Sequence, residues 1–101
     1  MSEVLALTVK NINSKRGTMV DNITQLRGAQ LNGRVIDVDY AVTKRLQLSG
    51  ARFASAAAPV LRRNLCGVGP DAAIISSGGS YRFNYRYENG RNVGTVVIDH
   101  C

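Results

Sequence analysis

The sequence has few of the side chains that bind metals or react covalently. Its 101 residues include only two cysteines and one histidine. Two cysteines are fewer than the common structural zinc sites require, and the spacing of His100, Cys66 and Cys101 does not form a metal-binding motif. We therefore predict no metal site and no cofactor. Because no catalytic constellation is evident either, we predict that the chain is not an enzyme.

Long apolar stretches are also missing. No run approaches the roughly twenty apolar residues of a membrane-spanning helix, so no transmembrane segment is predicted. The opening MSEVLALTVK is interrupted by Thr8 and Lys10 and does not have the form of a signal peptide. We expect either a cytoplasmic protein or an exported one whose leader is absent from this sequence. Without repeats or low-complexity tracts, residues 1–101 are predicted to form a single domain.

Acidic residues are outnumbered by basic ones, seven to thirteen, which gives a net charge of +6. This balance is compatible with a nucleic acid, an anionic lipid or an acidic protein as partner. The candidate basic patch consists of Arg62, Arg63, Arg82, Arg86 and Arg91. In sheets that stack nucleic-acid bases the aromatic side chains are exposed. In SYRFNYRY they share one face and the arginines share the other, so we expect a buried aromatic face and keep nucleic-acid binding as the alternative.

Two Asn-Gly pairs predict two β-hairpins. After the first pair, at positions 32–33, apolar residues alternate with polar ones, which places Asp37 and Asp39 on a solvated sheet face. A three-residue loop, which sets Leu26 opposite Val38 and Arg27 opposite Asp37, is the favoured register. The alternative is a two-residue loop that sets Arg27 opposite Val38.

The second hairpin surrounds the Asn-Gly pair at positions 89–90. A two-residue loop predicts that Glu88 and Arg91 pair beside the turn. It also predicts three cross-strand pairs on the aromatic face: Tyr85 with Gly94, Phe83 with Val96, and Tyr81 with Ile98.

Apolar residues at helical spacing predict helices over 2–15, 49–67 and 70–79. Pro59 is expected to kink the second helix or to begin a new segment. The order is then α-β-β-α-α-β-β. We predict an α+β domain in which helices pack on one face of a four-stranded antiparallel sheet built from the two hairpins.

The two cysteines follow different predicted elements. Cys66 lies at the end of the second helix, and Cys101 follows the last strand. A disulfide between them would tie that strand to the helices and would contribute about 3–4 kcal/mol in the chain-entropy model. We favour this pairing over two reduced thiols, and it predicts a periplasmic or extracellular location. A nucleophile–base pair of Cys101 with His100 is not predicted, because neighbouring strand residues point to opposite faces.

Two other patterns are interpreted as structural. GVGPDA and SSGGS do not match a phosphate-binding loop, and we interpret them as turns and helix ends. Asp37 and Asp39 share a strand face, but no apolar neighbours that would raise their pKa are evident.

The segment LRRNLCGVGPDAAIISSGGSYRFNYRYENGRNVGTVVIDHC resembles the beta-type pilotins of type II secretion systems. The likeness consists of a helix ending in Leu-Cys, a short helix after proline, an NG turn and a closing strand followed by cysteine. The same layout is similar to that of other small exported proteins of Gram-negative bacteria. Beta-type pilotins are periplasmic lipoproteins with an α+β fold, and they bind the C-terminal segment of secretin subunits.

The resemblance implies a structural disulfide between Cys66 and Cys101 and a protein as partner. A peptide helix or strand would dock in a groove between helices and sheet, or on an exposed edge strand. This sequence shows no lipidated cysteine. The resemblance assigns no partner-binding residue and no oligomeric state.

Overall fold

The computed structural model describes residues 2–67 and 69–101. Met1 lies outside them, as does Val68 of the GVGPDA segment. The elements follow the order α1 (Ser2–Asn13), β1 (Thr24–Asn32), β2 (Val35–Val42), α2 (Gly50–Leu65), α3 (Pro70–Ser76), β3 (Ser80–Tyr87) and β4 (Asn92–Ile98). Helix α2 is continuous through Pro59, so no new helix begins at this residue. No helix in the described part of the chain is long and apolar enough to cross a bilayer.

The helices form where capping and apolar spacing agree. At the start of α2, the hydroxyl of Ser49 accepts a hydrogen bond from the N–H of Arg52. Phe53 and Leu61 turn toward the sheet from this helix, and Leu5 is the buried residue of α1. Both helices are amphipathic and therefore need the sheet to cover their apolar sides.

The sheet is mixed, which corrects the expectation of an antiparallel sheet. Its order is β1-β2-β3-β4. The two hairpins are antiparallel, but they meet through a parallel β2–β3 pair, with Val35 opposite Ser80 and Val42 opposite Tyr87. The reason lies in residues 43–79, where α2 carries the chain back to the end of the sheet at which β2 began. A strand–helix–strand connection of this kind joins parallel strands.

The first hairpin also differs from its predicted register. Gly33 and Arg34 form a two-residue turn, and Ala29 rather than Leu26 lies opposite Val38. A β-bulge at Arg27 then shifts the register, so that Leu26 lies opposite Tyr40. One extra residue in β1 lets Leu26 and Ala29, three positions apart, both face the core. Neither predicted register included this bulge.

The second hairpin follows its predicted pairing away from the turn. Tyr85 lies opposite Gly94, Phe83 opposite Val96, and Tyr81 opposite Ile98, which confirms those three pairs. At the turn the prediction was wrong, because Tyr87 rather than Glu88 bonds to Arg91, through a 2.8 Å hydrogen bond from its N–H to the Arg91 carbonyl. The loop is therefore one residue longer, and a register shift between Tyr85 and Arg86, with Val93 as the extra residue of β4, compensates for it.

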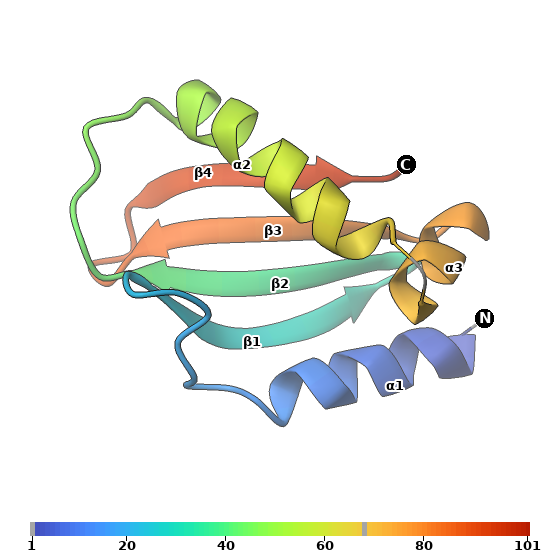
Figure 1. Cartoon of the computed structure of the whole chain (residues 1–101). Coiled ribbons are helices and arrows are strands. Elements are labelled where there is room, and N and C mark those ends of the chain that lie inside the picture. Colours follow the sequence, from blue (N-terminus) through green and yellow to red (C-terminus); the bar gives the residue numbers. More distant parts are fainter. Residues whose placement is uncertain (1, 68) are drawn as a thin grey trace.

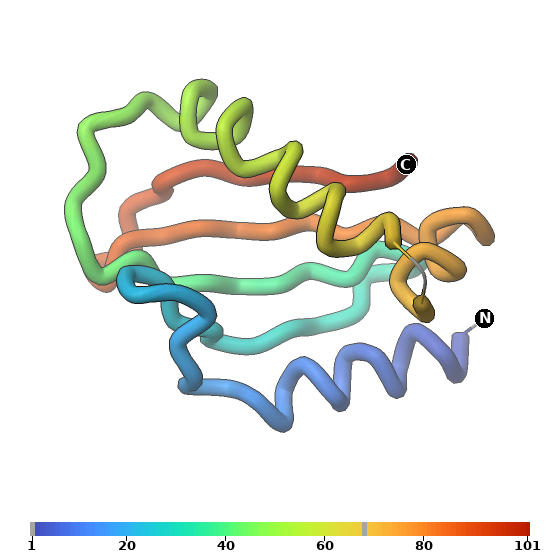
Figure 2. Tube along the Cα trace, viewed as in Figure 1, coloured from blue at the N-terminus to red at the C-terminus, as the bar shows by residue number. Residues whose placement is uncertain are grey.

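The helices and the sheet form two layers. In Figures 1 and 2, α1 runs along β1, α2 crosses above β4, and α3 lies at the end of the sheet where β3 begins. Helix α1 packs against β1 and α2 against β4, the two edge strands of the sheet. The inner strands β2 and β3 consequently lie beneath the space between the helices.

Candidate functional site

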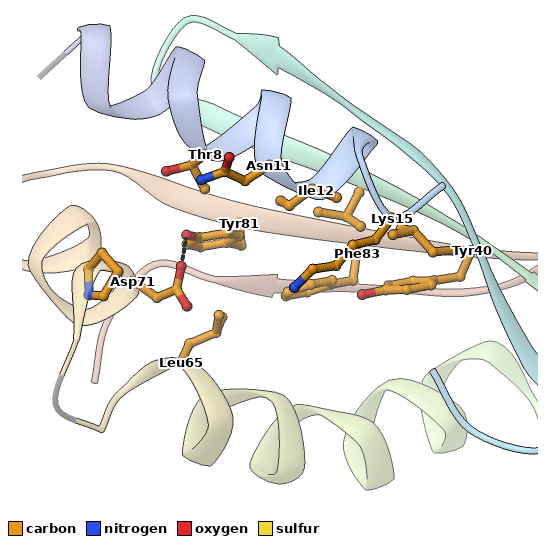
Figure 3. A pocket seen from close by; sticks show the side chains of 12 residues that line it. Thr8, Asn11, Ile12, Lys15, Tyr40, Leu65, Asp71, Tyr81 and Phe83 are labelled. Atoms are coloured by element: carbon orange, nitrogen blue, oxygen red, sulfur yellow. Dashed lines mark hydrogen bonds between the residues drawn. The ribbon is translucent and has the colours of Figure 1, made fainter. Parts of the chain in front are cut away.

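A groove runs between α1 and α2 above the inner strands (Figure 3). Its cavity has a volume of about 450 Å³. The floor comes from β1, β2 and β3, one wall from α1 and the turn after it, and the other wall from the end of α2 and the start of α3. The volume and the largely apolar lining are typical of binding pockets.

The floor of the groove is a row of aromatic rings. Tyr81 stacks on Phe83 with ring centroids 5.9 Å apart, and Phe83 lies 6.1 Å from Tyr40. The row continues below α2, where Tyr40 stacks on Tyr85 at 4.9 Å and Phe53 meets Tyr85 edge to face at 4.7 Å. The parallel pairing sets Tyr40 opposite Tyr85 and thereby joins the rings of β2 and β3. Such contacts hold the rings in fixed positions.

The α1 wall consists of residues at helical spacing. Thr8, Asn11, Ile12 and Lys15 line the groove, and Figure 3 shows them extending from α1 and its last turn toward the rings. Positions i, i+3, i+4 and i+7 share one side of a helix. This wall therefore presents one apolar side chain, that of Ile12, together with three side chains that can form hydrogen bonds, those of Thr8, Asn11 and Lys15.

The opposite wall holds the Tyr81 hydroxyl in place. Leu65 extends into the groove from the end of α2, and the Tyr81 hydroxyl donates a hydrogen bond to the Asp71 carboxylate (Figure 3). Burial of the phenol, with a further contribution from this bond and the Asp71 charge, raises the pKa of Tyr81 above its ordinary value. Tyr81 therefore remains neutral at physiological pH.

Basic side chains are in excess on α2, one of the helices beside the groove, whereas α3 contributes the acidic Asp71. Helix α2 contains Arg52, Arg62 and Arg63 and no acidic residue. In α1 the single acid, Glu3, is followed by Lys10, and Lys15 lines the groove itself. An acidic ligand would be attracted to this side of the molecule.

The opposite face of the sheet carries an ion-pair network. Asp37 is 2% exposed and accepts hydrogen bonds from Arg82 Nε at 2.5 Å, from Arg82 Nη2 at 2.8 Å and from the amides of Asn32 and Asn84. The bonds from Arg82 are the main reason that the pKa of Asp37 falls to about 2. The prediction of a solvated Asp37 was therefore wrong, whereas Asp39 is partly exposed and lies 3.6 Å from Arg86 Nη1.

The five predicted patch arginines do not form one surface. Arg82 and Arg86 are on the sheet face opposite the helices, where they pair with Asp37 and Asp39. Arg62 and Arg63 are on α2, and Arg91 follows the turn of the second hairpin. These five side chains therefore do not combine into the single basic patch that the sequence suggested.

The structure contains the disulfide between Cys66 and Cys101, with Cα atoms 5.6 Å apart. It joins the end of α2 to the segment after β4. Nearby, Arg62 Nε donates to the carbonyl of His100 at 3.4 Å. His100 Nδ1 lies 2.7 Å from the Asp99 carboxylate and lowers the pKa of Asp99. In the disulfide Cys101 has no free thiol.

The sequence predicts that a peptide could dock in a groove between helices and sheet, but it does not identify the residues that line this groove. The helical spacing of Thr8, Asn11 and Lys15 is visible in the sequence. However, the parallel pair that joins Tyr40 to the rings of β3 depends on how the two hairpins meet. Asp71 could have been found only through its contact with Tyr81.

Comparisons with known proteins identify the fold alone. No family model matches the sequence, and no curated protein matches it. Among solved structures, the crystal structure of a candidate secreted protein from Pseudomonas aeruginosa is similar, with a TM-score of 0.80 and 14% sequence identity. The match covers 97% of this chain and 88% of that one. The two chains share this α+β architecture over nearly their whole length.

Proposed function

We propose that the protein is a non-enzymatic, exported protein-binding domain whose groove between α1 and α2 receives an amphipathic peptide helix with acidic flanks. The observation that carries the proposal is the aromatic floor of the inner strands, which lies between two helices that pack on the edge strands. A further helix laid along this groove would bury its own apolar side against the rings.

A helix fits this groove better than an extended peptide. The aromatic part of the floor belongs to β2 and β3, which pair with strands on both sides and therefore offer few free backbone groups. An extended peptide would leave its own N–H and C=O groups without partners against an apolar floor. A helix satisfies these groups internally and can dock through side chains alone.

The groove must widen for such a helix to reach the rings. Tyr81 and Phe83 are only 2% and 4% exposed. Helix α1 is held at its C-terminal end, where Asn13 bonds both the N–H and the C=O of Ala29. Toward its other end, Leu5 is its buried side chain. The N-terminal half of α1 can therefore swing outward only if Leu5 leaves the core, and we expect the apolar side of the docked peptide to replace the contacts of Leu5.

Charge defines the flanks of the partner. Lys15 lines the groove, and the neighbouring helix α2 carries three arginines and no acidic residue. Glutamate or aspartate beside the apolar side of the peptide would lie close to these cations and would accelerate association.

Two observations support an exported location. The Cys66–Cys101 disulfide is of a kind that persists mainly in oxidising compartments. The structural neighbour from Pseudomonas aeruginosa is described as a candidate secreted protein. Within this proposal, the sequence resemblance to beta-type pilotins makes the C-terminal segment of a secretin subunit the first natural partner to test.

The test uses a designed helical peptide of about 18 residues, or five turns, with a leucine-rich side and glutamate flanks. Calorimetric titration is expected to give a Kd of about 1–100 µM. A peptide with the same apolar side and lysine flanks should bind at least about tenfold more weakly. Equal affinity for both peptides would overturn the charge assignment, and no binding of either would overturn the proposal.

A matched pair of variants locates the site. Lys15→Glu and Lys10→Glu change the charge equally, but only Lys15 lines the groove. Lys15→Glu is expected to weaken binding of the acidic peptide about tenfold, and Lys10→Glu about threefold or less. Equal losses in both variants would mean that the peptide responds to net charge and not to the groove.

A further inference from the structure

The N-terminal end of α2 is fixed by close packing on β4. A Cβ atom added at Gly94 of β4 would lie 3.2 Å from the backbone oxygen of Gly50 and 2.8 Å from Cδ1 of Phe53. The ring of Phe53 also meets Tyr85 edge to face. Backbone and side chains are in contact here, so this end of the helix has little freedom to move relative to the sheet.

The C-terminal end of α2 is held in a different way. None of residues 50–65 is fully buried, and the apolar side chains of this helix are only partly covered, whereas α1 places Leu5 in the core. The specific ties at this end are the Cys66–Cys101 disulfide and the hydrogen bond from Arg62 to the carbonyl of His100. The disulfide therefore supplies a large part of the restraint on the end of α2.

The same end of α2 forms one wall of the groove. Leu65 and Pro70 line the groove, and Cys66 lies between them in the sequence. Gly67 and Gly69 belong to the same connection, and a Cβ atom added at either would meet no described atom within 4 Å. This connection has room to move, so a displacement of the disulfide-bonded end of α2 would move the wall with it.

We propose that the Cys66–Cys101 disulfide is a redox-controlled latch on the peptide groove, an inference that rests on the proposed function. While the bond is closed, the α2 wall is held in place, so a docking peptide must displace Leu5 of α1 from the core. Reduction releases the C-terminal end of α2, which swings outward about its fixed N-terminal end. The open groove is then more populated, and a protein whose binding-competent state is more populated binds its ligand more tightly.

The reductant that this exchange requires is a dithiol. Cys101 is exposed, and a cavity of about 480 Å³ beside the bond is lined by both cysteines and by α3. One thiolate of the dithiol attacks the Cys101 sulfur, the bond to Cys66 breaks, and the Cys66 sulfur leaves as a thiolate and takes up a proton. The second thiolate of the dithiol then displaces the Cys101 sulfur, which is protonated in turn. The dithiol ends as a disulfide, and the protein ends with two thiols.

Calorimetric titration with the acid-flanked helical peptide tests the latch. The protein reduced with dithiothreitol is expected to bind this peptide with a Kd at least about fivefold lower than that of the oxidised protein. The double variant Cys66→Ser/Cys101→Ser should match the reduced protein and should not respond to dithiothreitol. An equal or higher Kd after reduction would overturn the proposal. Circular dichroism verifies that the reduced protein and the variant are folded.

A second variant keeps the disulfide but lengthens its attachment. Two glycines inserted between Asp99 and His100 extend the tail by up to about 7 Å, and the chain remains cross-linked. The Kd for the peptide should fall at least about threefold, because the end of α2 can then move with the bond intact. The same insertion between Asn89 and Gly90, in the turn of the second hairpin, is the control and should change the Kd about twofold or less. An unchanged Kd after the tail insertion would overturn the proposal.

Relaxation-dispersion NMR of the free protein tests the latch without the peptide. Outward motion of a helix end takes place in microseconds to milliseconds. The reduced protein should therefore show exchange broadening at the amides of Leu61 and Leu65, with none at Phe53, and the oxidised protein should show none at these three positions. The same flat profiles in both forms would overturn the latch even where the peptide binds. Absence of peptide binding in both forms would instead overturn the proposed function.

Discussion

Asp37 on β2 and Arg82 on β3 lie directly opposite each other at the parallel junction of the two hairpins, joined by hydrogen bonds of 2.5 and 2.8 Å. The carboxylate is buried, whereas the guanidinium side chain is 45% exposed. The pair therefore connects the two halves of the sheet on the face that the helices leave open. It is the one ion pair of the described residues in which the carboxylate is fully buried.

This pair predicts a pH dependence of stability. The folded-state pKa of Asp37 is about 2, below the ordinary aspartate value of 3.8. A lowered pKa stabilises the fold above the unfolded-state value, and this contribution is lost as the pH falls from about 4 toward 2. Allowing for the exposure of Arg82, we expect a loss of about 1–2 kcal/mol from this group. Urea unfolding at pH 7 and near pH 2 measures it.

Two variants assign the acid-induced loss to Asp37. Between pH 7 and about pH 2, the free energy of unfolding of Asp37→Asn should fall by about 1–2 kcal/mol less than that of the wild-type protein. Asp39→Asn changes the same side-chain type on the same sheet face, but Asp39 is partly exposed and its contact with Arg86 is 3.6 Å long. It should change stability by about 0.5 kcal/mol or less. An unchanged pH dependence in Asp37→Asn would contradict the assignment.

Removal of the disulfide gives a second prediction. The double variant Cys66→Ser/Cys101→Ser should lower the free energy of unfolding by about 3–4 kcal/mol, because the unfolded chain is no longer cross-linked across 35 positions. Urea unfolding of the double variant, and of the wild-type protein with and without reductant, measures this loss. The reduced wild-type protein should match the double variant. Equal stability of all three samples would show that the disulfide contributes nothing.

Gly94 gives a third prediction. A Cβ atom at this position would lie 2.8 Å from Cδ1 of Phe53 and 3.2 Å from the backbone oxygen of Gly50. Gly94→Ala should therefore destabilise the fold by about 1–3 kcal/mol, since both α2 and the ring of Phe53 would have to shift. Gly67→Ala is the control, because nothing lies within 4 Å of its added Cβ, and it should be nearly neutral. Comparable thermal unfolding of the two variants would contradict the close packing of α2 on β4.

The parts of the fold that could be predicted are those determined by residues close together in the sequence. The pairs of Tyr81, Phe83 and Tyr85 in the second hairpin could be predicted because large rings alternate along one strand and a glycine faces one of them. The register of the first hairpin could not, since the bulge at Arg27 reverses the alternation within β1. The antiparallel prediction failed because the helices between the hairpins return the chain to the end of the sheet where β2 begins, which makes β2 and β3 parallel.

The surroundings of the charged and aromatic residues also depend on contacts between strands that are distant in the sequence. Asp37 was expected to be solvated because its own strand has no residue that covers it, whereas Arg82 covers it from β3, a strand distant in sequence. The aromatic floor combines Tyr40 with Phe83 and Tyr81 through the same long-range pairing. Side-chain alternation identifies the buried face of each strand, but it does not identify which strands meet.

The most direct test of the groove is an NMR titration of the ¹⁵N-labelled protein with the acid-flanked helical peptide. The largest amide shifts are expected at Thr8, Asn11 and Lys15 on one wall and at Asp71 and Tyr81 on the other. Small shifts are expected at Arg82 and Arg86 on the opposite sheet face. Shifts confined to that face or to β4, with the two walls unchanged, would contradict the account.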